Sequence, residues 1–359
     1  MKIGLSEASH TRGSIYTMAS ICSLPAPASA LARPRRATRG RSLVPLISAG
    51  LLRPRSPALA RLSSSSAAGR RAMAMTAAAS QDVVLEDGPA PGGGDCLWGS
   101  YLSCNTVGSH RVQVVKDEEE VGPALCEAVA DAAEDSIASK GSFAMAIPGG
   151  SVLSMLAGLA AYTNVDWSKV HVFYVNHKAV AMDDDAATHK KAMALFAAPL
   201  GIPPGQVYAL GGSDDAAEEA KAYVRAMEGV GEGVLPVSSG LPVFDLVLLG
   251  MGSDGHIGSL YPNRPETLAG PEAPWCLGVV KEKPPASVSL TLPVINNAKW
   301  VMGAMTGRDK KTGGTKSASV ARAIQGSDPV GAFPAQGVKS ATWILDALAA
   351  ADLVMPEGE

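Results

Sequence analysis

The sequence predicts one α/β domain in which helices cover both faces of a mainly parallel, doubly wound sheet. From about residue 108 onward, short apolar runs alternate with longer segments of helical periodicity. The short runs are apolar throughout, which is typical of parallel strands that are buried on both faces. Hydrophobic residues make up 47% of the 359-residue chain, enough for a sizeable core.

The first half of the domain is predicted from four strand–helix units. Residues 118–140 are expected to form a helix because five apolar residues share one helical face: Val121, Leu125, Val129, Ala132 and Ile137. A later helix is expected to have Ser213 as its N-cap and acidic residues in its first turn. The expected strands are 111–115, 143–147, 170–175 and 207–210, and the expected helices are 118–140, 151–162, 190–198 and 213–229.

The second half continues the alternation and completes a single domain over residues 108–355, with a small inserted subregion. The expected strands are 244–250, 275–280, 287–292 and 300–306, and the last helices are expected within 310–326 and 340–353. Residues 79–107 contain the Gly- and Pro-rich run PAPGGGD and are expected to be a linker or an extended lead-in.

The charge of the chain is distributed unevenly. Residues 1–80 hold 12 of the 31 Lys and Arg residues but one of the 34 Asp and Glu residues, so the remainder carries a net charge of −14. An Arg-rich, Ser-rich and acid-poor start predicts a disordered transit peptide, residues 1–78, which the organelle import machinery recognises. The abundance of Ser and Ala favours the plastid stroma over the mitochondrion. A basic tail that binds nucleic acid is the alternative interpretation.

The sequence supports neither a membrane-spanning protein nor one held together by disulfides or zinc. No apolar run reaches the roughly 18 residues that a membrane span requires. The five cysteines include no Cys-x-x-Cys pair and no Cys–His cluster with zinc spacing. We therefore expect no disulfide framework and a reducing compartment.

The loops that follow parallel strands are expected to hold the site, because ligands of such sheets bind at the carboxyl ends of the strands. Those loops are residues 148–151, 176–189, 250–264 and 306–316. In the first of them, Gly149, Gly150 and Ser151 lie between a strand and a helix, where free backbone amides can bind an anion. The alternative is an ordinary tight turn with Ser151 as N-cap.

A second glycine-rich loop, GMGSDGH (250–256), matches G-x-G-x-x-G but lacks the context of a dinucleotide site. A dinucleotide fingerprint leads directly into a helix, and here Pro262 and Pro265 follow within ten residues of the third glycine. The loop instead presents Asp254 and His256, and a histidine beside an acid can serve as a general base. A structural histidine is the alternative.

Several blocks in order along the chain resemble one known family. They are GGS after a strand, FDLVLLGMGSDGHIGSLYP, PPASVSLTLPVINNAKWVMGAMTGRDKK and the closing FPAQ and WILDALAA. Together these blocks resemble the 6-phosphogluconolactonase family, in particular its plant plastid type, within the wider glucosamine-6-phosphate isomerase/deaminase-like group. The resemblance spans residues 108–352. It implies a Rossmann-like fold and the hydrolysis of 6-phosphogluconolactone, a small-molecule sugar-phosphate lactone, in the oxidative pentose phosphate pathway without a metal or organic cofactor.

The resemblance also implies roles for individual residues. His256 matches the catalytic histidine that activates water, and Asp254 would orient that histidine or its loop. The residues implied in phosphate binding are Gly149, Gly150 and Ser151, together with Lys178 and Lys310.

The sequence departs from the family pattern in the phosphate region. The family triplet Asp-Glu-Arg is here Asn176-His177-Lys178, and the arginine of the Pro-Pro-x-Arg-Ile-Thr block is replaced by Ser287. Lysine keeps the positive charge but not the bidentate guanidinium fork. These departures leave two alternatives to the lactonase: a weakened or inactive homologue that binds sugar phosphate or a protein partner, and a sugar-phosphate isomerase or deaminase.

The remaining polar residues are interpreted as structural. The run Asp183-Asp184-Asp185 is expected to be a solvated loop rather than a metal site. His177 and His189 are expected at the surface, and Asp245 is expected to fix loop structure rather than to act in catalysis.

Overall fold

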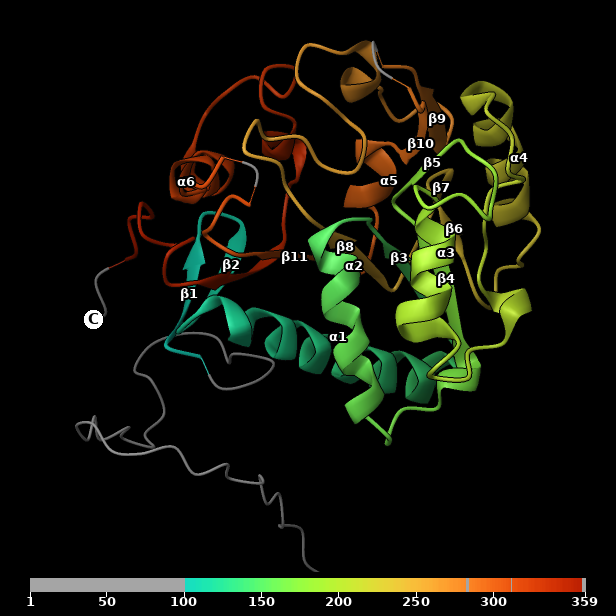
Figure 1. Cartoon of the computed structure of the whole chain (residues 1–359), viewed down its shortest axis with the longest axis horizontal. Coiled ribbons are helices and arrows are strands. Elements are labelled where there is room, and N and C mark those ends of the chain that lie inside the picture. Colours follow the sequence, from blue (N-terminus) through green and yellow to red (C-terminus); the bar gives the residue numbers. More distant parts are fainter. Residues whose placement is uncertain (1–100, 282–283, 311, 357–359) are drawn as a thin grey trace, which may run out of the picture. The chain divides into compact units, whose positions relative to one another are not determined.

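A seven-stranded sheet forms the centre of the computed structural model, which describes residues 101–281, 284–310 and 312–356. The expected transit peptide lies outside these residues. Strand β1 pairs with β2 in antiparallel fashion, and every other pairing in this sheet is parallel (Figure 1). In spatial order the strands are β1 (Ser103–Val107), β2 (His110–Val115), β12 (Thr342–Asp346), β11 (Trp300–Met305), β8 (Leu246–Leu249), β3 (Phe143–Ile147) and β4 (Val170–Tyr174).

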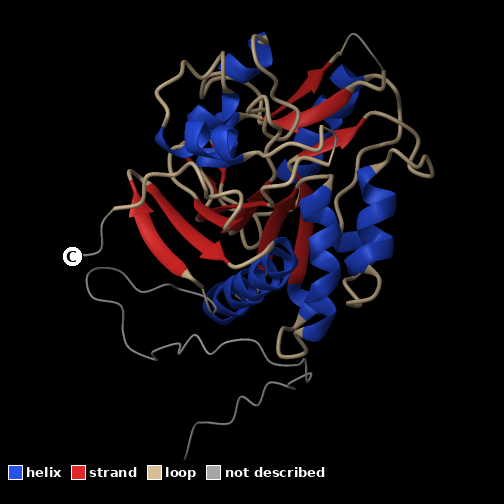
Figure 2. Cartoon of the chain, turned by 60° about the vertical axis from the view of Figure 1, so that its left-hand side comes forward, coloured by secondary structure: helices blue, strands red, loops and turns tan. Residues whose placement is uncertain are grey.

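Apolar side chains from both faces of this sheet are buried in two separate clusters. In β3, Ala144 and Ala146 belong to one cluster, while Phe143, Met145 and Ile147 belong to the other. This division follows from the two-residue period of a strand. Helix α1 contributes Val121 and Leu125 to the second cluster, and α4 and α6 contribute to the first. Helices therefore cover both faces, as predicted for a doubly wound sheet (Figure 2).

The helices are short except for α1 and α4. The α-helices are α1 (Glu118–Lys140), α2 (Ser151–Met155), α3 (Thr188–Ala192), α4 (Ala216–Glu228), α5 (Leu292–Asn296) and α6 (Ser317–Gln325). The 3-10 segments are η1 (Leu156–Ala161), η2 (Trp167–Lys169), η4 (Pro204–Gln206), η5 (Pro265–Leu268) and η6 (Pro334–Gly337), and η3 (Met193–Ala197) is a π-helical turn. Along the part of the chain that the structure describes, no helix is long and apolar enough to span a membrane.

Two smaller sheets lie outside the central sheet. Strands β5 (Asn176–Lys178), β10 (Ser287–Leu290) and β9 (Cys276–Val279) make an antiparallel sheet beside α4 (Figure 1). Strands β6 (Val237–Ser238) and β7 (Leu241–Pro242) form a two-stranded hairpin. The backbone N–H of Leu290 donates to the carbonyl of Val175 at 2.8 Å, so the antiparallel sheet is attached directly after β4.

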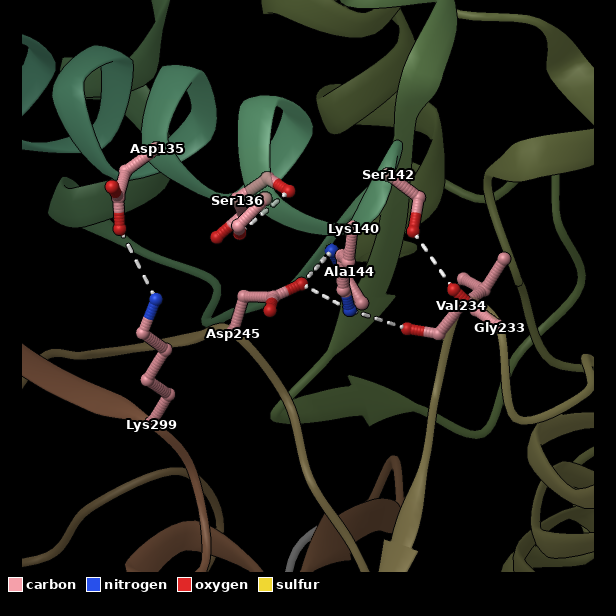
Figure 3. Close-up of polar contacts among 10 residues, drawn as sticks. Asp135, Ser136, Lys140, Ser142, Ala144, Gly233, Val234, Asp245 and Lys299 are labelled. Atoms are coloured by element: carbon pink, nitrogen blue, oxygen red, sulfur yellow. Dashed lines mark hydrogen bonds and ion pairs between the residues drawn. The ribbon is translucent and has the colours of Figure 1, made fainter.

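Asp245 stabilises the start of β8, as the sequence predicted for a structural residue. Its carboxylate accepts hydrogen bonds from the Ala144 backbone N–H and from Lys140 Nζ, each at 2.7 Å (Figure 3). Lys140 also donates to the carbonyl of Val234 at 2.8 Å, and Ser142 donates to that of Gly233 at 3.1 Å. The buried carboxylate thus connects the turn between α1 and β3 to the neighbouring strand.

The predicted helix at residues 340–353 is wrong, because Thr342–Asp346 form strand β12. The run Thr-Trp-Ile has high strand propensity, and β12 lies between β2 and β11, where both of its faces are buried. The expected strand at 207–210 is also wrong, since Val207 makes only an isolated bridge with Val172.

Two boundaries and one cysteine also differ from the predictions. The N-cap of α4 is Asp215, whose Oδ1 accepts from the backbone N–H groups of Ala217 and Glu218, and not Ser213. The last residues of the expected lead-in, 103–107, form β1. Cys104 takes part in a disulfide bond, which the cysteine spacing did not predict, whereas Cys126 and Cys276 are free and buried.

Candidate active site

Four loops leave the central sheet on one side, at the carboxyl edge where its parallel strands end. They are residues 148–151 after β3, 176–189 after β4, 250–264 after β8 and 306–316 after β11. These four strands are parallel to one another, so their ends meet at this edge.

The side chain of Asn176 connects two of these loops. Its Oδ1 accepts a hydrogen bond from the Gly149 backbone N–H at 3.4 Å. Its Nδ2 donates to the carbonyl of Gly258 at 3.2 Å and to Ser259 Oγ at 3.1 Å. An amide has both an acceptor and donors, so a single side chain can serve both loops. The sequence identified Asn176 only as a departure from a family pattern, and this connecting role was missed.

The 250–256 loop folds back on itself directly after β8. The backbone N–H of Gly252 donates to the His256 carbonyl at 3.0 Å, and that of Gly255 donates to the Gly252 carbonyl at 2.9 Å. Met251 and Ile257 form an antiparallel bridge across the loop. No helix begins at the third glycine, as the sequence predicted, so this G-x-G-x-x-G lacks the structural context of a dinucleotide fingerprint.

His256 and Asp254 form a close pair within this loop. His256 Nδ1 lies 2.6 Å from Asp254 Oδ1, which also accepts from the His256 backbone N–H at 3.2 Å. The two side chains are 27% and 52% exposed, so the pair remains accessible from solvent. Partial burial raises the pKa of Asp254, but the charge of His256 and its hydrogen bonds outweigh that effect, and the pKa lies below its ordinary value. Because the carboxylate accepts a hydrogen bond from Nδ1, that nitrogen carries the proton of the neutral ring and Nε2 carries the lone pair.

The glycines of the loop make room for this pair. A Cβ on Gly252 would lie 2.2 Å from His256 Cε1 and 2.6 Å from Asp254 Oδ1. Gly255 has a φ of +82°, and a Cβ there would lie 2.5 Å from the ring of Phe333. The Ala335 backbone N–H donates to the Gly255 carbonyl at 2.9 Å. The closing FPAQ block therefore packs directly against the loop that presents His256.

Tyr261 and Lys281 extend the site beyond His256. The rings of His256 and Tyr261 are 4.8 Å apart between centroids. Lys281 Nζ lies 3.8 Å from the centroid of the Tyr261 ring and donates to the Tyr261 hydroxyl. An ammonium group over an aromatic face is a favourable cation–π contact. Sequence reasoning missed Lys281, because its position depends on the path of the chain between β9 and β10.

Lys178 adds a second ammonium group close to Lys281. It is half-buried in β5, where its Nζ donates to Ser287 Oγ on the neighbouring β10 at 3.0 Å. Burial lowers the pKa of Lys178, and the positive charge of Lys281 lowers it further. Among the described residues no carboxylate forms an ion pair with Lys178. Two neighbouring cations without a carboxylate on Lys178 favour the binding of an anion.

The Gly149–Ser151 loop lies at the same edge. Gly150 is the N-cap of α2 and Ser151 its first residue, so the alternative with Ser151 as N-cap is wrong. Gly149 adjoins Thr188, whose Oγ1 is 3.5 Å from the position that a Cβ would occupy. The loop is joined to Asn176, and through it to the loop of His256.

The structure does not bring Lys310 and Arg264 into this group. Lys310 is exposed in the 306–316 loop, and none of the described contacts joins it to His256 or Lys178. Arg264 pairs with Glu266 at 3.0 Å and donates to the carbonyl of Val280 at 2.6 Å.

The two histidines of the 176–189 loop are not surface residues. His177 is 1% exposed; its Nδ1 donates to the Lys178 carbonyl at 2.6 Å and its Nε2 accepts from the His189 backbone N–H at 3.0 Å. Burial lowers the pKa of both rings. His189 is half-buried, and its Nδ1 is 2.9 Å from the Tyr174 hydroxyl. The expectation of surface positions is therefore wrong, and both residues shape the loop.

The Asp183–Asp185 run forms a turn. Asp184 Oδ1 accepts from the Ala186 backbone N–H at 2.7 Å, and Asp185 pairs with Lys190 at 2.7 Å. Within the described ranges, no group of three or more His, Cys, Asp or Glu side chains is arranged to hold a metal ion.

Solved structures share the fold of this chain. The 6-phosphogluconolactonase of Trypanosoma brucei superposes with a TM-score of 0.57 at 22% identity, covering 69% of this chain and all of that one. The Thermotoga maritima 6-phosphogluconolactonase gives a TM-score of 0.53 at 19% identity, covering 66% and 98%.

Two curated relatives are rice proteins. A rice protein (Oryza sativa subsp. indica) named probable 6-phosphogluconolactonase 4, chloroplastic, is 33% identical over 209 residues, which are 56% of this chain and 64% of the rice protein. Probable 6-phosphogluconolactonase 2 of rice is 29% identical over 255 residues, 68% of this chain and 90% of that protein. The family model described as glucosamine-6-phosphate isomerases/6-phosphogluconolactonase matches residues 116–345. The chain therefore belongs to the family of glucosamine-6-phosphate isomerases and 6-phosphogluconolactonases.

Proposed function

We propose that this protein hydrolyses 6-phospho-D-glucono-1,5-lactone to 6-phosphogluconate, a step of the oxidative pentose phosphate pathway. The relatives named above support the choice of substrate. One structural relationship carries the proposal: the His256 ring contacts Tyr261, the Tyr261 ring contacts Lys281, and the charge of Lys281 acts on Lys178. A general base thus lies beside a pair of cations, which suits an ester that bears a phosphate.

In the proposed mechanism His256 is the general base. Its Nε2 takes a proton from water as the water oxygen attacks C1 of the lactone. Asp254, bonded to Nδ1, orients the ring and stabilises the imidazolium that forms. When the tetrahedral intermediate collapses, the bond between C1 and the ring oxygen breaks and His256 returns the proton to that oxygen. The products are a hydroxyl group on C5 and a carboxylic acid, which releases its proton to solvent and becomes a carboxylate. Neither a metal nor an organic cofactor takes part.

The phosphate of the substrate is proposed to bind Lys178 and Lys281. Both ammonium groups donate hydrogen bonds, and the approach of a phosphate dianion relieves the repulsion between them. The backbone of Gly149, Gly150 and Ser151 is proposed to bind the same phosphate, and Lys310 is proposed as a further cation from the 306–316 loop. The backbone N–H groups of Gly252 and Gly255 are already bonded within their own loop, so we do not assign them to the carbonyl oxygen of the lactone.

The plastid stroma is the proposed location, with residues 1–78 as the segment that the import machinery recognises. The chloroplastic names of rice relatives support the plastid. A fluorescent protein fused to residues 1–80 should enter plastids. Retention in the cytosol or entry into mitochondria would contradict this part of the proposal.

The test of the activity is the hydrolysis of freshly prepared lactone by the purified chain, measured as acid release above the spontaneous rate. A rate no higher than the spontaneous one would overturn the proposal. In that case, binding of 6-phosphogluconate measured by calorimetry would indicate an inactive sugar-phosphate binder. Turnover of glucosamine 6-phosphate would instead indicate an isomerase or deaminase.

A further inference from the structure

The side chain of Tyr261 lies between the proposed base and Lys281, and the proposed mechanism leaves its hydroxyl unused. The rings of Tyr261 and His256 are 4.8 Å apart between centroids and are tilted by 35°. Lys281 Nζ lies 3.8 Å from the centroid of the same Tyr261 ring. One aromatic ring therefore contacts both the imidazole of His256 and the ammonium group of Lys281.

The backbone around Tyr261 is held in place by buried neighbours. The Tyr261 carbonyl accepts a hydrogen bond from Thr267 Oγ1 at 2.7 Å, and Thr267 is buried. Directly before Tyr261, the backbone N–H of Leu260 donates to the Ile257 carbonyl at 2.9 Å, and both of these side chains are buried. The backbone position of Tyr261 is thus set by the fold, independently of Lys281.

The Tyr261 hydroxyl accepts a hydrogen bond and keeps its own proton available. Its oxygen accepts from Lys281 Nζ. In the part of the chain that the structure describes, no side chain or carbonyl accepts the proton of this hydroxyl. A phenol can accept and donate at the same time, and a hydroxyl that accepts from a charged donor becomes a stronger donor itself. The hydroxyl of this half-buried residue is therefore suited to donate to a bound ligand.

Lys178 lies near the same hydroxyl. Burial and the charge of Lys281 lower the pKa of Lys178, and the interaction with Tyr261 partly opposes them. Lys178 Nζ donates to Ser287 Oγ at 3.0 Å, which uses one of the three N–H groups of an ammonium. The Tyr261 hydroxyl and the Lys178 ammonium are therefore two neighbouring hydrogen-bond donors that come from different segments of the chain.

We propose that the Tyr261 hydroxyl donates a hydrogen bond to the phosphate of the substrate, beside Lys178. This inference rests on the proposed lactonase function. A phosphate dianion only accepts hydrogen bonds, so it matches a hydroxyl and an ammonium as donors. In a 6-phospho-1,5-lactone the phosphate is joined to the reacting C1 through O6, C6, C5 and the ring oxygen. A phosphate on the Tyr261 hydroxyl thus keeps C1 near His256, which packs against the ring of the same residue.

Tyr261→Phe tests the proposal, because it removes the hydroxyl and retains the ring against His256. The dissociation constant for 6-phosphogluconate, measured by calorimetry, and KM for the lactone should each rise about 10-fold, as expected for the loss of one hydrogen bond to a charged group. KM should rise by a larger factor than kcat falls. Inorganic phosphate, as a competitive inhibitor of hydrolysis, should lose affinity by the same factor as 6-phosphogluconate.

Tyr208→Phe is the matched control, because it removes a hydroxyl from a half-buried tyrosine elsewhere in the fold. The Tyr208 hydroxyl is 3.0 Å from His171 Nδ1, near the start of β4. This is the amino edge of the central sheet, where the parallel strands begin, and the candidate active site lies at the other edge. The control should bind 6-phosphogluconate as the wild-type chain does.

A second variant separates a direct contact with phosphate from an effect through Lys281. If the hydroxyl only positioned Lys281, Tyr261→Phe would have no further effect in a Lys281→Met background. A direct contact keeps its effect on the dissociation constant in that background. Disappearance of the effect would therefore overturn the proposal.

Three other results bear on the proposal. Unchanged 6-phosphogluconate binding in Tyr261→Phe that remains folded by circular dichroism would overturn it, as would the absence of such binding in the wild-type chain. An unchanged inhibition constant for phosphate would assign the contact to the sugar and also overturn it. Lactone hydrolysis by the wild-type chain is measured separately. A rate no higher than the spontaneous one would refute the lactonase function, while 6-phosphogluconate binding would still test the hydroxyl.

Discussion

His256 Nδ1 and Asp254 Oδ1 are 2.6 Å apart, while the Asp254 carboxylate remains 52% exposed. This geometry is suited to a base that must gain and release a proton in each turnover, because the carboxylate fixes the ring and balances its charge. It also separates the roles of the two residues. His256 is the proposed catalytic residue, and Asp254 acts through it as a positioning residue.

His256→Ala is therefore expected to lower kcat by roughly 10²–10⁴-fold, the usual contribution of a general base. Asp254→Asn should lower kcat less and leave KM for the lactone unchanged, since Asp254 does not contact the phosphate in the proposed complex. Initial rates over a range of lactone concentrations separate the two constants. Full activity in His256→Ala would remove this residue from the mechanism, and a purely structural role for Asp254 would lower the melting temperature instead of kcat.

Gly252→Ala should abolish the proposed activity without unfolding the protein. The new Cβ would lie 2.2 Å from His256 Cε1, so the imidazole must move away from its bonded position. A displacement of about 1 Å typically lowers the rate about 10²-fold. Gly205→Ala is the matched control, because no atom lies within 4 Å of a Cβ at that position. Equal kcat values for the two variants would show that the glycine is not required for the site.

The sequence predicted this loop well because its residues are neighbours in the chain. Gly252, Asp254 and His256 all lie within the seven residues that follow β8, so a local pattern contains the whole arrangement. Lys281 approaches Tyr261 only through the path of a distant loop, and no local pattern encodes that approach. His177 was mistaken for a surface residue because Asn-His-Lys is a polar triplet, and only tertiary contacts bury its ring.

The fold, like the loop, was predicted from the sequence where its signals are local. Helix α1 was predicted with its observed ends, since its acidic first turn and its apolar face are local signals. Residues 340–353 combine strand-forming Thr-Trp-Ile with helix-forming Ala-Leu-Ala-Ala, so the local signals conflict. The strand forms because residues 342–346 pair with both β2 and β11, and this pairing exists only in the assembled sheet.

Removing either ammonium group near Tyr261 should weaken substrate binding more than it slows chemistry. A hydrogen bond to a charged group contributes about 1.5–3 kcal/mol, so Lys281→Met or Lys178→Met should raise KM by about 10-fold or more. Lys178→Arg should keep the wild-type KM or lower it, because guanidinium can bind phosphate through two donors. Lys190→Met serves as the control for loss of a surface charge. An unchanged KM in Lys281→Met would exclude Lys281 from the phosphate site.

The free energy of unfolding should fall below pH 6.5 in part because of His177. Burial lowers the pKa of this ring in the folded state, so the native histidine stays neutral while the unfolded chain takes up a proton near its ordinary pKa of about 6.5. Its contribution is complete above that pH and is lost as the pH falls towards the lowered pKa. Protonation of Nε2 also removes the acceptor for the His189 backbone N–H.

His177→Gln removes this titration while retaining an amide donor and acceptor. Urea unfolding is measured at about pH 7.5, 6.5 and 5.5, which cover both sides of the ordinary histidine pKa. The free energy of unfolding should change less with pH in the variant than in the wild-type protein. The slopes of the free energy of unfolding against pH can differ between the two proteins by up to about 1.4 kcal/mol per pH unit, the maximum for one titrating group. His110, His171 and His189, whose pKa values burial also lowers, remain in both proteins and cancel in the comparison. Parallel pH profiles for the two proteins would contradict the assignment to His177.

Asp245→Ala should destabilise the fold without impairing the proposed chemistry. The buried carboxylate accepts from the Ala144 backbone N–H and from Lys140, and hydrogen bonds to charged groups contribute about 1.5–3 kcal/mol. Asp245 precedes β8, whereas His256 follows the other end of that strand, so kcat should remain near the wild-type value. Asp135→Ala breaks an exposed ion pair and should cost at most about 1 kcal/mol. Urea unfolding and initial rates on the same preparations test both statements, and a large loss of kcat in folded Asp245→Ala would show that the amino edge influences the active site.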